Sequence, residues 1–237
     1  MAPGPHGERR ASTGRAPCYL RPRVEPDYWR RRWREGRTGW QLAEPNPHLV
    51  RHRAVLEGAR RILVPLCGKS RDLAWLRSEI GAEVVGVELV AEAARTFFEE
   101  HGLSAERIVE GSLERWRGGG IEIVCGDLFA LGPAQLGRFD GAFDRAALYA
   151  LPPPLRARYV PQVRALLEPG ARLLLVSLVH DAGDAEPPFS VGPDEVRALY
   201  ADLQVTALDR TDVTASSESL RARGAHTVLE DAWRLVV

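Results

Sequence analysis

The stretch from Ile62 to Ser70, Ile-Leu-Val-Pro-Leu-Cys-Gly-Lys-Ser, constrains the fold more than any other part of the chain. It begins as a short apolar strand and then breaks abruptly at a proline and a glycine. A helical pattern from Asp72 to Leu76 follows, and a second apolar run, Val84 to Glu88, ends in an acid. Strand, glycine turn, helix, strand and acid, in this order, are typical of a nucleoside-binding βαβ unit. We therefore expect an α/β fold whose central turn meets a ligand.

Two phosphate-binding patterns fit this turn poorly. A P-loop requires glycine at position 63, where Leu63 stands, so the phosphate-wrapping turn of a nucleotide hydrolase is missing. A dinucleotide fold requires three glycines in G-x-G-x-x-G, and only Gly68 is present. Pro65 and Leu66 would also block the close approach of a pyrophosphate.

S-adenosylmethionine has no phosphate and fits the pattern better. Its site needs a turn beside the methionine part, an acid for the ribose hydroxyls, and an apolar wall with a polar tip for adenine. The segment Leu66 to Gly68, then Glu88, then Asp127 with Leu128 offer these groups in chain order. Asp127 follows a strand pattern and so lies on the ligand-binding rim of an α/β sheet, although an Asx-turn explains an acid there equally well.

The remaining patterns complete one sheet with its covering helices. We expect strands at 121–125, 139–145, 172–178, 204–208 and 226–236, helices at 48–58, 91–101, 155–167 and 194–200, and a polar, glycine-rich excursion at 102–120. The strand at 139–145 ends in Asp144 and Arg145, which places a cation on the same rim. Arg145 is a candidate for binding the acceptor or the cofactor carboxylate, and the alternative is an ion pair with Asp144 or Glu88.

Three tryptophans precede this region. Trp29 and Trp33 are four residues apart and so share a face of a helix that Asp27 can cap. Trp40 follows a glycine break. The helix is either an ordinary amphipathic helix packed on the domain or a lid whose aromatic rings cover a flat ligand.

Length and charge limit the other possibilities. A chain of 237 residues suits one α/β domain, which we place at 24–237, with lid helices at 24–58, a Rossmann-like core at 59–237 and a disordered arm at 1–23. The arm is rich in arginine, so a transit peptide is the alternative there. A formal net charge of 0 and the lack of long apolar runs argue against nucleic acid and membrane partners.

The cysteines and histidines indicate neither a disulfide framework nor a metal. Three cysteines without zinc spacing fit a reducing compartment, and we expect a cytoplasmic monomer. His48 and His52 are four residues apart, but no third ligand stands at a supporting spacing, so we expect no metal.

Several motifs together resemble the thiopurine S-methyltransferase family. They are Trp29-x-x-x-Trp33, Val64-Pro65-Leu66-Cys67-Gly68-Lys69-Ser70, Val84-Val85-Gly86-Val87-Glu88, Asp144-Arg145-Ala146-Ala147-Leu148, Arg156-x-x-Tyr159 and Pro187-Pro188-Phe189-Ser190-Val191. The similarity runs from about residue 27 to near the C-terminus. The chain departs from the family pattern at Trp40-Gln41, where Phe-His is usual, at His180, where Tyr is common, and at Glu186.

The resemblance implies a class I methyltransferase fold, a three-layer sandwich around a seven-stranded, mostly parallel sheet whose last strand is antiparallel. It implies S-adenosylmethionine as methyl donor, with S-adenosylhomocysteine as product, and a small-molecule thiol on an aromatic heterocycle as acceptor. The positions that match the family's cofactor site are Trp29 and Trp33 of the lid, Leu66, Gly68, Glu88, Asp127, Leu128 and Arg145. Trp40 and Arg145 match acceptor-pocket positions.

The expected reaction is direct in-line transfer of the methyl group to sulfur, with positioning by Arg145 and no covalent intermediate. Cys67 is expected to be a turn residue, because no base stands beside it in the sequence. Two alternatives stay open: a methyltransferase of halide, thiocyanate, or selenium or tellurium oxyanions, and a cofactor-binding protein without turnover.

Overall fold

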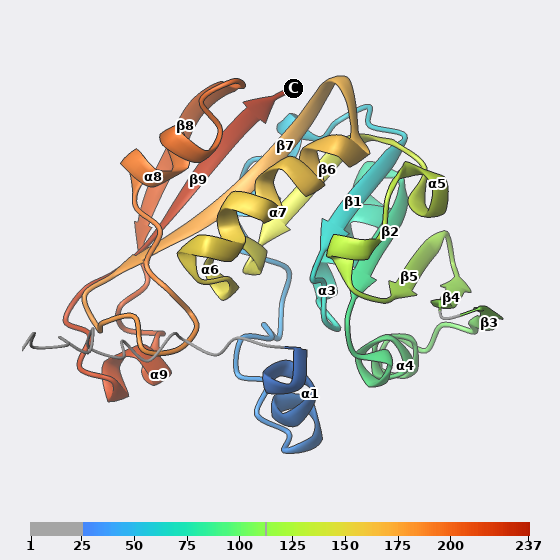
Figure 1. Cartoon of the computed structure of the whole chain (residues 1–237), viewed down its shortest axis with the longest axis horizontal. Coiled ribbons are helices and arrows are strands. Elements are labelled where there is room, and N and C mark those ends of the chain that lie inside the picture. Colours follow the sequence, from blue (N-terminus) through green and yellow to red (C-terminus); the bar gives the residue numbers. More distant parts are fainter. Residues whose placement is uncertain (1–25, 112) are drawn as a thin grey trace, which may run out of the picture.

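A nine-stranded mixed sheet forms the centre of the computed structural model, which describes residues 26–111 and 113–237 (Figure 1). The strand order is β3-β4-β5-β2-β1-β6-β7-β9-β8. The strands are β1 (Arg61–Pro65), β2 (Glu83–Glu88), β3 (Glu106–Glu110), β4 (Leu113–Gly118), β5 (Ile121–Cys125), β6 (Phe139–Arg145), β7 (Leu167–His180), β8 (Gln204–Asp212) and β9 (Val228–Val236). The expected arm at 1–23 lies outside the described residues.

Five neighbouring strands run parallel and end at one edge. β1 pairs with β2 on one side and with β6 on the other, β5 extends the sheet beyond β2, and β7 extends it beyond β6. The strand order therefore reverses direction at β1, the type of place where open α/β sheets bind ligands beyond the carboxyl ends of their strands. β9 is antiparallel to both β7 and β8, as the expected fold requires.

The strand count of seven was wrong because the excursion at 102–120 is itself a hairpin. β3 and β4 pair antiparallel, and β4 adds this hairpin to the edge of the sheet beside β5. The hairpin carries alternating charges, and its buried Arg115 pairs with Glu122 of β5 at 2.7 Å. Such a polar edge lacks the apolar alternation that identifies a strand in a sequence. The other seven strands have the expected arrangement, and the α/β fold class is confirmed.

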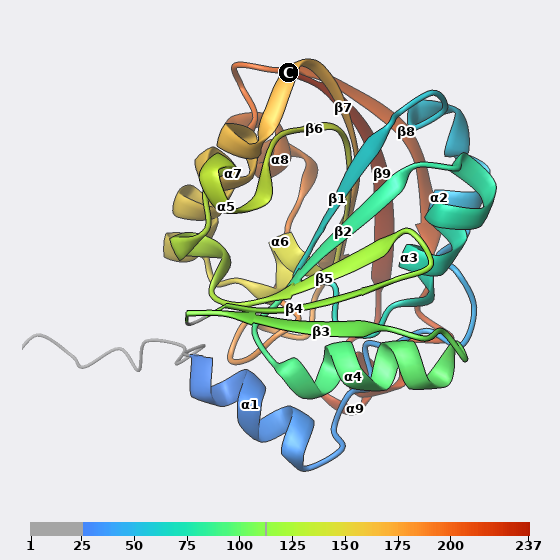
Figure 2. The same ribbon diagram turned by 90° about the vertical axis from the view of Figure 1, so that its right-hand side faces the viewer.

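Helices cover both faces of the sheet, which confirms the three-layer arrangement (Figure 2). One face carries α5 (Pro133–Leu136), α6 (Ala147–Ala150), α7 (Pro153–Leu166) and α8 (Pro193–Leu199). The other carries α2 (Pro47–Arg51), the 3-10 turn η1 (Arg53–Val55), α3 (Arg71–Trp75), the π-helical turn η2 (Leu76–Ile80) and α4 (Ala91–Glu100). The expected helix at 48–58 is thus two short pieces. The turn η3 (Leu128–Ala130), α9 (Glu218–Ala222) and α1 (Pro26–Arg34) complete the described elements.

Strand side chains alternate between two apolar cores. In β1, Leu63 joins the core under α7, whereas Ile62 and Val64 join the core under α3 and α4. In β7, Leu173 and Leu175 face the first core, and Leu174 and Val176 face the second. The central strands are thus buried on both faces, as crossover helices require. The carboxyl ends of the strands are left as the accessible edge.

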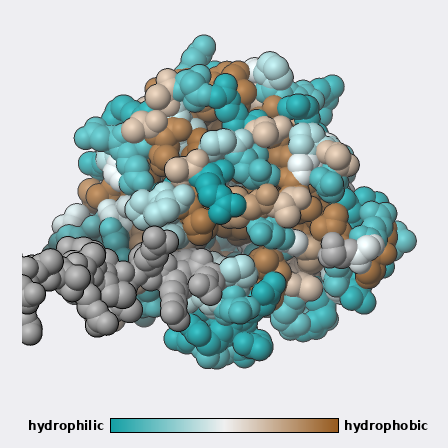
Figure 3. All heavy atoms as spheres, in the orientation of Figure 1, coloured by the Kyte–Doolittle hydropathy of each residue, from teal (hydrophilic) through white to brown (hydrophobic). Residues whose placement is uncertain are grey.

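Hydrophilic residues cover most of the face that carries α7, and apolar residues show between them (Figure 3). Among the described helices, none combines the length and the apolar character that a bilayer crossing requires.

Candidate functional site

The central turn joins β1 to α3 through two left-handed residues. Leu66 has φ 47° and Gly68 has φ 55°, and the backbone N–H of Cys67 between them donates to the carbonyl of Val87 in β2. Ser70 ends the turn and caps α3, because its side chain accepts a hydrogen bond from the N–H of Asp72 at 3.2 Å. The turn is thus held at both ends.

Two residues other than glycine hold left-handed backbone in the described chain, and both lie at this edge. They are Leu66, after β1, and Ala146 (φ 78°), after β6. Left-handed conformation is costly for a residue with a Cβ atom, and such strain concentrates at functional sites. The strained positions therefore indicate the site independently of the sequence motifs.

Glu88 is the last residue of β2, and its carboxylate binds the central turn. One carboxylate oxygen accepts a hydrogen bond from the N–H of Gly68 at 2.9 Å, and the other accepts one from the N–H of Val90 at 2.8 Å. Glu88 is 6% exposed, and this burial raises the pKa of its carboxyl, against the opposing effect of the N–H groups of Val90, Gly68 and Leu89. Each oxygen retains a lone pair for a further donor.

Asp127 and Leu128 follow β5 at the same edge. The Asp127 carboxylate accepts a hydrogen bond from the N–H of Phe129 at 3.0 Å and caps η3, so the Asx-type turn considered from the sequence is present. Asp127 itself is exposed, whereas Leu128 is buried. The pair thus combines a buried apolar side chain with an exposed carboxylate.

Arg145, at the end of β6, is held on one side only. Its Nη1 donates to the carbonyl of Trp40 at 2.8 Å, and its buried Nε has no hydrogen-bond partner among the described residues. Burial lowers the pKa of Arg145, but the nearby Tyr149, Glu230 and Asp72 outweigh it, and the pKa is raised. The guanidinium therefore stays charged and keeps a donor for an anion or a ring acceptor.

Asp144 does not pair with Arg145. Its carboxylate accepts a hydrogen bond from the hydroxyl of Tyr159 in α7 at 2.7 Å and another from the N–H of Leu148. Complete burial raises the pKa of Asp144 to about 6, although both bonds act against this rise. The alternative considered for Arg145, an ion pair with Asp144, is thus absent from the described contacts, and Asp144 anchors α7 and α6 instead.

Helix α1 lies beyond the edge at which β1 and β6 end (Figures 1 and 2). It begins at Pro26, so Asp27 lies in its first turn rather than at its cap. Trp40 packs edge-on against Trp29 and Trp33, with ring centroids 5.4 Å and 6.3 Å apart. Trp33 also reaches the central turn, because a Cβ atom on Gly68 would lie 3.6 Å from its ring.

Gln41 is a site residue that the sequence patterns missed. A Cβ atom on Gly68 would collide with the Gln41 side-chain amide. Gln41 thus lies against the central turn, although it is far from the turn in sequence. Only its place after Trp40, where the chain departs from the usual Phe-His, signalled a special role.

Arg156 of α7 packs beside the loop Pro187-Pro188-Phe189, which follows β7. Arg156 is buried, donates to the carbonyl of Leu151 at 2.8 Å and pairs with Glu195 at 2.7 Å. Its guanidinium lies 5.9 Å from the ring centroid of Phe189, whose N–H donates to the carbonyl of Tyr149. These motif residues therefore shape the edge without exposing reactive groups.

Cys67 is buried beneath the turn. Burial, and then the neighbouring Glu88, raise the pKa of its thiol well above the usual range. A thiol that stays protonated in this way is a poor nucleophile. Lys69, the only lysine of the chain, pairs with Glu100 at the end of α4.

Known proteins share the sequence pattern and the fold of this chain. The thiopurine S-methyltransferase family model matches residues 24–236. A thiopurine S-methyltransferase of Pseudomonas putida (strain GB-1) is 43% identical over 215 residues, which cover 90% of this chain and 99% of the relative. One of Azotobacter vinelandii is 43% identical over 216 residues, with the same coverage.

A solved structure shares the fold at lower sequence identity. It is the 1,6-didemethyltoxoflavin-N1-methyltransferase of Burkholderia thailandensis with bound 1,6-didemethyltoxoflavin and S-adenosylhomocysteine. It matches with a TM-score of 0.61 and 22% identity, over 88% of this chain and 86% of that one.

Proposed function

Because the chain belongs to the thiopurine S-methyltransferase family, we propose that it methylates the sulfur of a thiopurine or a similar heterocyclic thiol with S-adenosylmethionine. The observation that carries the proposal is that Glu88 can hold the central turn and bind the ribose of the cofactor at the same time. Its two oxygens hold Gly68 and Val90 and still have lone pairs that suit the two hydroxyls of a ribose. The side chains of Gln41 and Trp33 lie against the face of Gly68 where a Cβ atom would stand, so a cofactor beside the turn would meet both residues.

Each of the other cofactor residues has a defined task in this proposal. Leu66 and Gly68 border the methionine part, Leu128 and Asp127 border adenine, and Trp33 covers the cofactor from α1, with Trp29 supporting Trp40. S-adenosylmethionine, when bound, supplies a methyl group on an electrophilic sulfonium. The part of the chain that the structure describes offers no activated nucleophile here, since the Cys67 thiol is protonated.

Arg145 has the main role toward the acceptor. Its charged and partly exposed guanidinium can bind the anionic form of a thiol or the acceptor ring. Trp40 holds Arg145 through its carbonyl and presents its indole beside the lid. Such a site works by positioning the acceptor and excluding water, which contributes up to ~7–11 kcal/mol in favourable cases.

The proposal includes a monomer in the cytoplasm that acts on a small molecule. Cys67 and Cys125 are free and buried, in keeping with a reducing compartment. The net charge of 0 gives no general attraction to nucleic acid.

Calorimetric titration with S-adenosylhomocysteine tests the cofactor site. We expect the wild-type chain to bind in the micromolar range and Glu88→Ala to bind much more weakly. Glu92→Ala is the matched control, because Glu92 is exposed on α4 and pairs with Arg95. A folded wild-type chain that does not bind would overturn the cofactor assignment.

An acceptor assay then tests the chemistry. We expect methylation of 6-mercaptopurine, measured against thiocyanate, iodide and selenite in the same assay. Turnover of the small anions alone would replace the thiol by the second acceptor class. Cofactor binding without turnover of any acceptor would favour a binding protein.

A further inference from the structure

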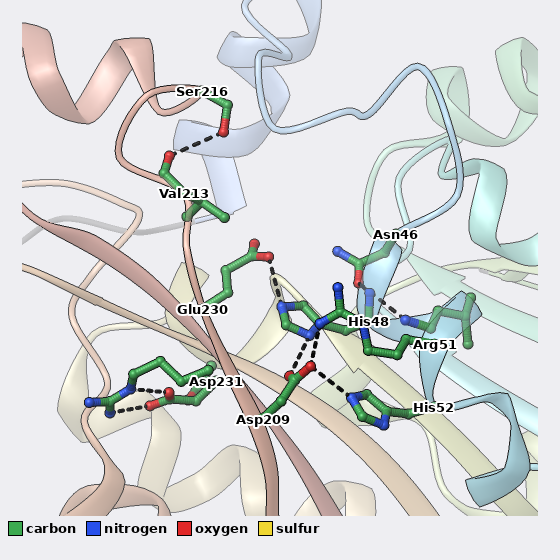
Figure 4. A network of polar contacts seen from close by, with 12 residues as sticks. Asn46, His48, Arg51, His52, Asp209, Val213, Ser216, Glu230 and Asp231 are labelled. Atoms are coloured by element: carbon green, nitrogen blue, oxygen red, sulfur yellow. Dashed lines mark hydrogen bonds and ion pairs between the residues drawn. The ribbon is translucent and has the colours of Figure 1, made fainter.

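His48 lies between two carboxylates that are remote in the sequence (Figure 4). Its Nδ1 is 2.9 Å from Oδ1 of Asp209 in β8, and its Nε2 is 3.4 Å from Oε2 of Glu230 in β9. His52, one helical turn later, places its Nε2 3.2 Å from the second oxygen of Asp209. Asp209 is thus the third group that the spacing of the two histidines lacked.

The fold positions these residues by two separate devices. Asn46 caps α2 by accepting hydrogen bonds from the N–H groups of His48 and Leu49, and its own N–H donates to Asp72 at 2.7 Å. The pairing of β8 with β9 is irregular between Ala207 and Asp209. Bulges of this kind re-aim side chains, and this one occurs where Asp209 meets α2.

One atom on each residue is buried and lacks a properly oriented hydrogen bond. These atoms are Nδ1 of His48, Nε2 of His52 and Oδ1 of Asp209. One potential ligand atom from each residue lies within 4.8 Å of the others, and His48 is only 2% exposed. Nδ1 of His48 and Oδ1 of Asp209 are 2.9 Å apart but do not form a well-aligned hydrogen bond. Poorly satisfied buried polar atoms are costly, and a single cation would satisfy all three.

We propose that His48, His52 and Asp209 form a binding site for a zinc-class divalent metal ion. Two imidazole nitrogens and one carboxylate oxygen are a ligand set that Zn²⁺ uses, with water in the fourth position. Glu230 completes the arrangement, because a metal-bound histidine usually donates its other ring N–H to a carboxylate. With Nδ1 of His48 on the metal, its Nε2–H faces Glu230.

Arg51 is the local competitor for this metal. Its guanidinium forms an ion pair with Asp209 and is half exposed. Arg51 holds Oδ2, whereas the cation would bind Oδ1, so the charge of the guanidinium opposes the cation without occupying its ligand atom. The competing arrangement without metal is a protonated His48 held between Asp209 and Glu230.

Zinc titration of the full chain, purified without a histidine tag and stripped with a chelator, tests the site. We expect one equivalent of Zn²⁺ in competition with a chelating indicator. His52→Ala and Asp209→Asn should each weaken binding at least tenfold, while Arg51→Gln should strengthen it. Glu230→Gln should weaken binding by about 10–100-fold, the usual effect of losing a carboxylate behind a metal-bound histidine.

Two further measurements keep the result interpretable. His52 and Asp209 are partly exposed, so their variants should fold, which circular dichroism verifies; His101→Ala is the control for a histidine outside the cluster. Co²⁺ should give the visible absorption of a tetrahedral site in the wild-type chain and not in His52→Ala. Absence of stoichiometric zinc, or unchanged binding in both His52→Ala and Asp209→Asn, would leave the metal-free ion pair as the explanation.

Discussion

Glu88 accepts a hydrogen bond of 2.9 Å from the backbone N–H of Gly68, a residue in the turn that follows the neighbouring strand β1. The acid of β2 therefore shapes the turn of β1. Because the same carboxylate faces the proposed ribose position, turn geometry and cofactor affinity should change together when either residue is replaced.

Gly68→Ala should lower both stability and cofactor affinity. A left-handed alanine costs about 1 kcal/mol of unfolding free energy, and its Cβ atom would collide with Gln41. Gly58→Ala is the matched control, since Gly58 has φ 77° but open space around it. We expect both variants to be destabilised in denaturant unfolding, Gly68→Ala more than Gly58→Ala, and S-adenosylhomocysteine binding to weaken in Gly68→Ala alone. Equal affinities would mean that the cofactor does not approach Gly68.

Trp33→Ala should weaken S-adenosylhomocysteine binding more than Trp29→Ala. Trp33 reaches the central turn, whereas Trp29 packs on Trp40 and Tyr28. Loss of one aromatic contact corresponds to roughly a 2–10-fold change in affinity. Calorimetry of both variants measures which of them binds S-adenosylhomocysteine more weakly. Trp33→Phe keeps an aromatic ring and should restore part of the affinity. Unchanged affinity in Trp33→Ala would show that α1 only packs on the domain.

Arg145→Ala should reduce kcat/KM for 6-mercaptopurine by about 10–100-fold. Hydrogen bonds to a charged group are worth about 1.5–3 kcal/mol, and Arg145 also fixes Trp40. Arg172→Ala serves as control, because Arg172 is partly exposed and donates to the carbonyl of Glu57. Steady-state kinetics should compare two acceptors, one anionic and one neutral at the assay pH. We expect Arg145→Ala to lose more kcat/KM with the anionic acceptor. Intact turnover would refute the assigned role.

Asp144 should make the wild-type chain less stable as the pH rises from about 4 to about 6. Its pKa is raised from 3.8 to about 6 on folding, so the folded state binds more protons in this range. The stabilising contribution is complete below pH 3.8 and is lost once the pH passes 6. The shift corresponds to about 3 kcal/mol.

Asp144→Asn isolates this effect. The asparagine loses part of the hydrogen bonding to Tyr159 or Leu148, and this loss does not depend on pH. It therefore shifts the free energy of unfolding by the same amount at every pH. The difference in unfolding free energy between wild type and variant, measured by denaturant unfolding from pH 3.5 to 8, should fall through the window and then level off. A difference that is constant with pH would mean that Asp144 is ionised normally.

The sequence was sufficient for the features that depend on short segments. The βαβ pattern around Gly68 and Glu88 predicted the parallel centre of the sheet. Because parallel strands end at one edge, the same pattern also predicted that Asp127 and Arg145 lie near the turn. Helix α1 followed from the four-residue spacing of Trp29 and Trp33.

Only the tertiary structure decided the contacts between distant segments. Gln41 against Gly68, Arg145 on the carbonyl of Trp40 and Asp209 beside His48 each join residues whose separation no local pattern encodes. The edge hairpin of β3 and β4 escaped prediction because its charged residues carry no apolar alternation. Periodicity records which face of an element is buried, whereas packing determines which remote residue covers it.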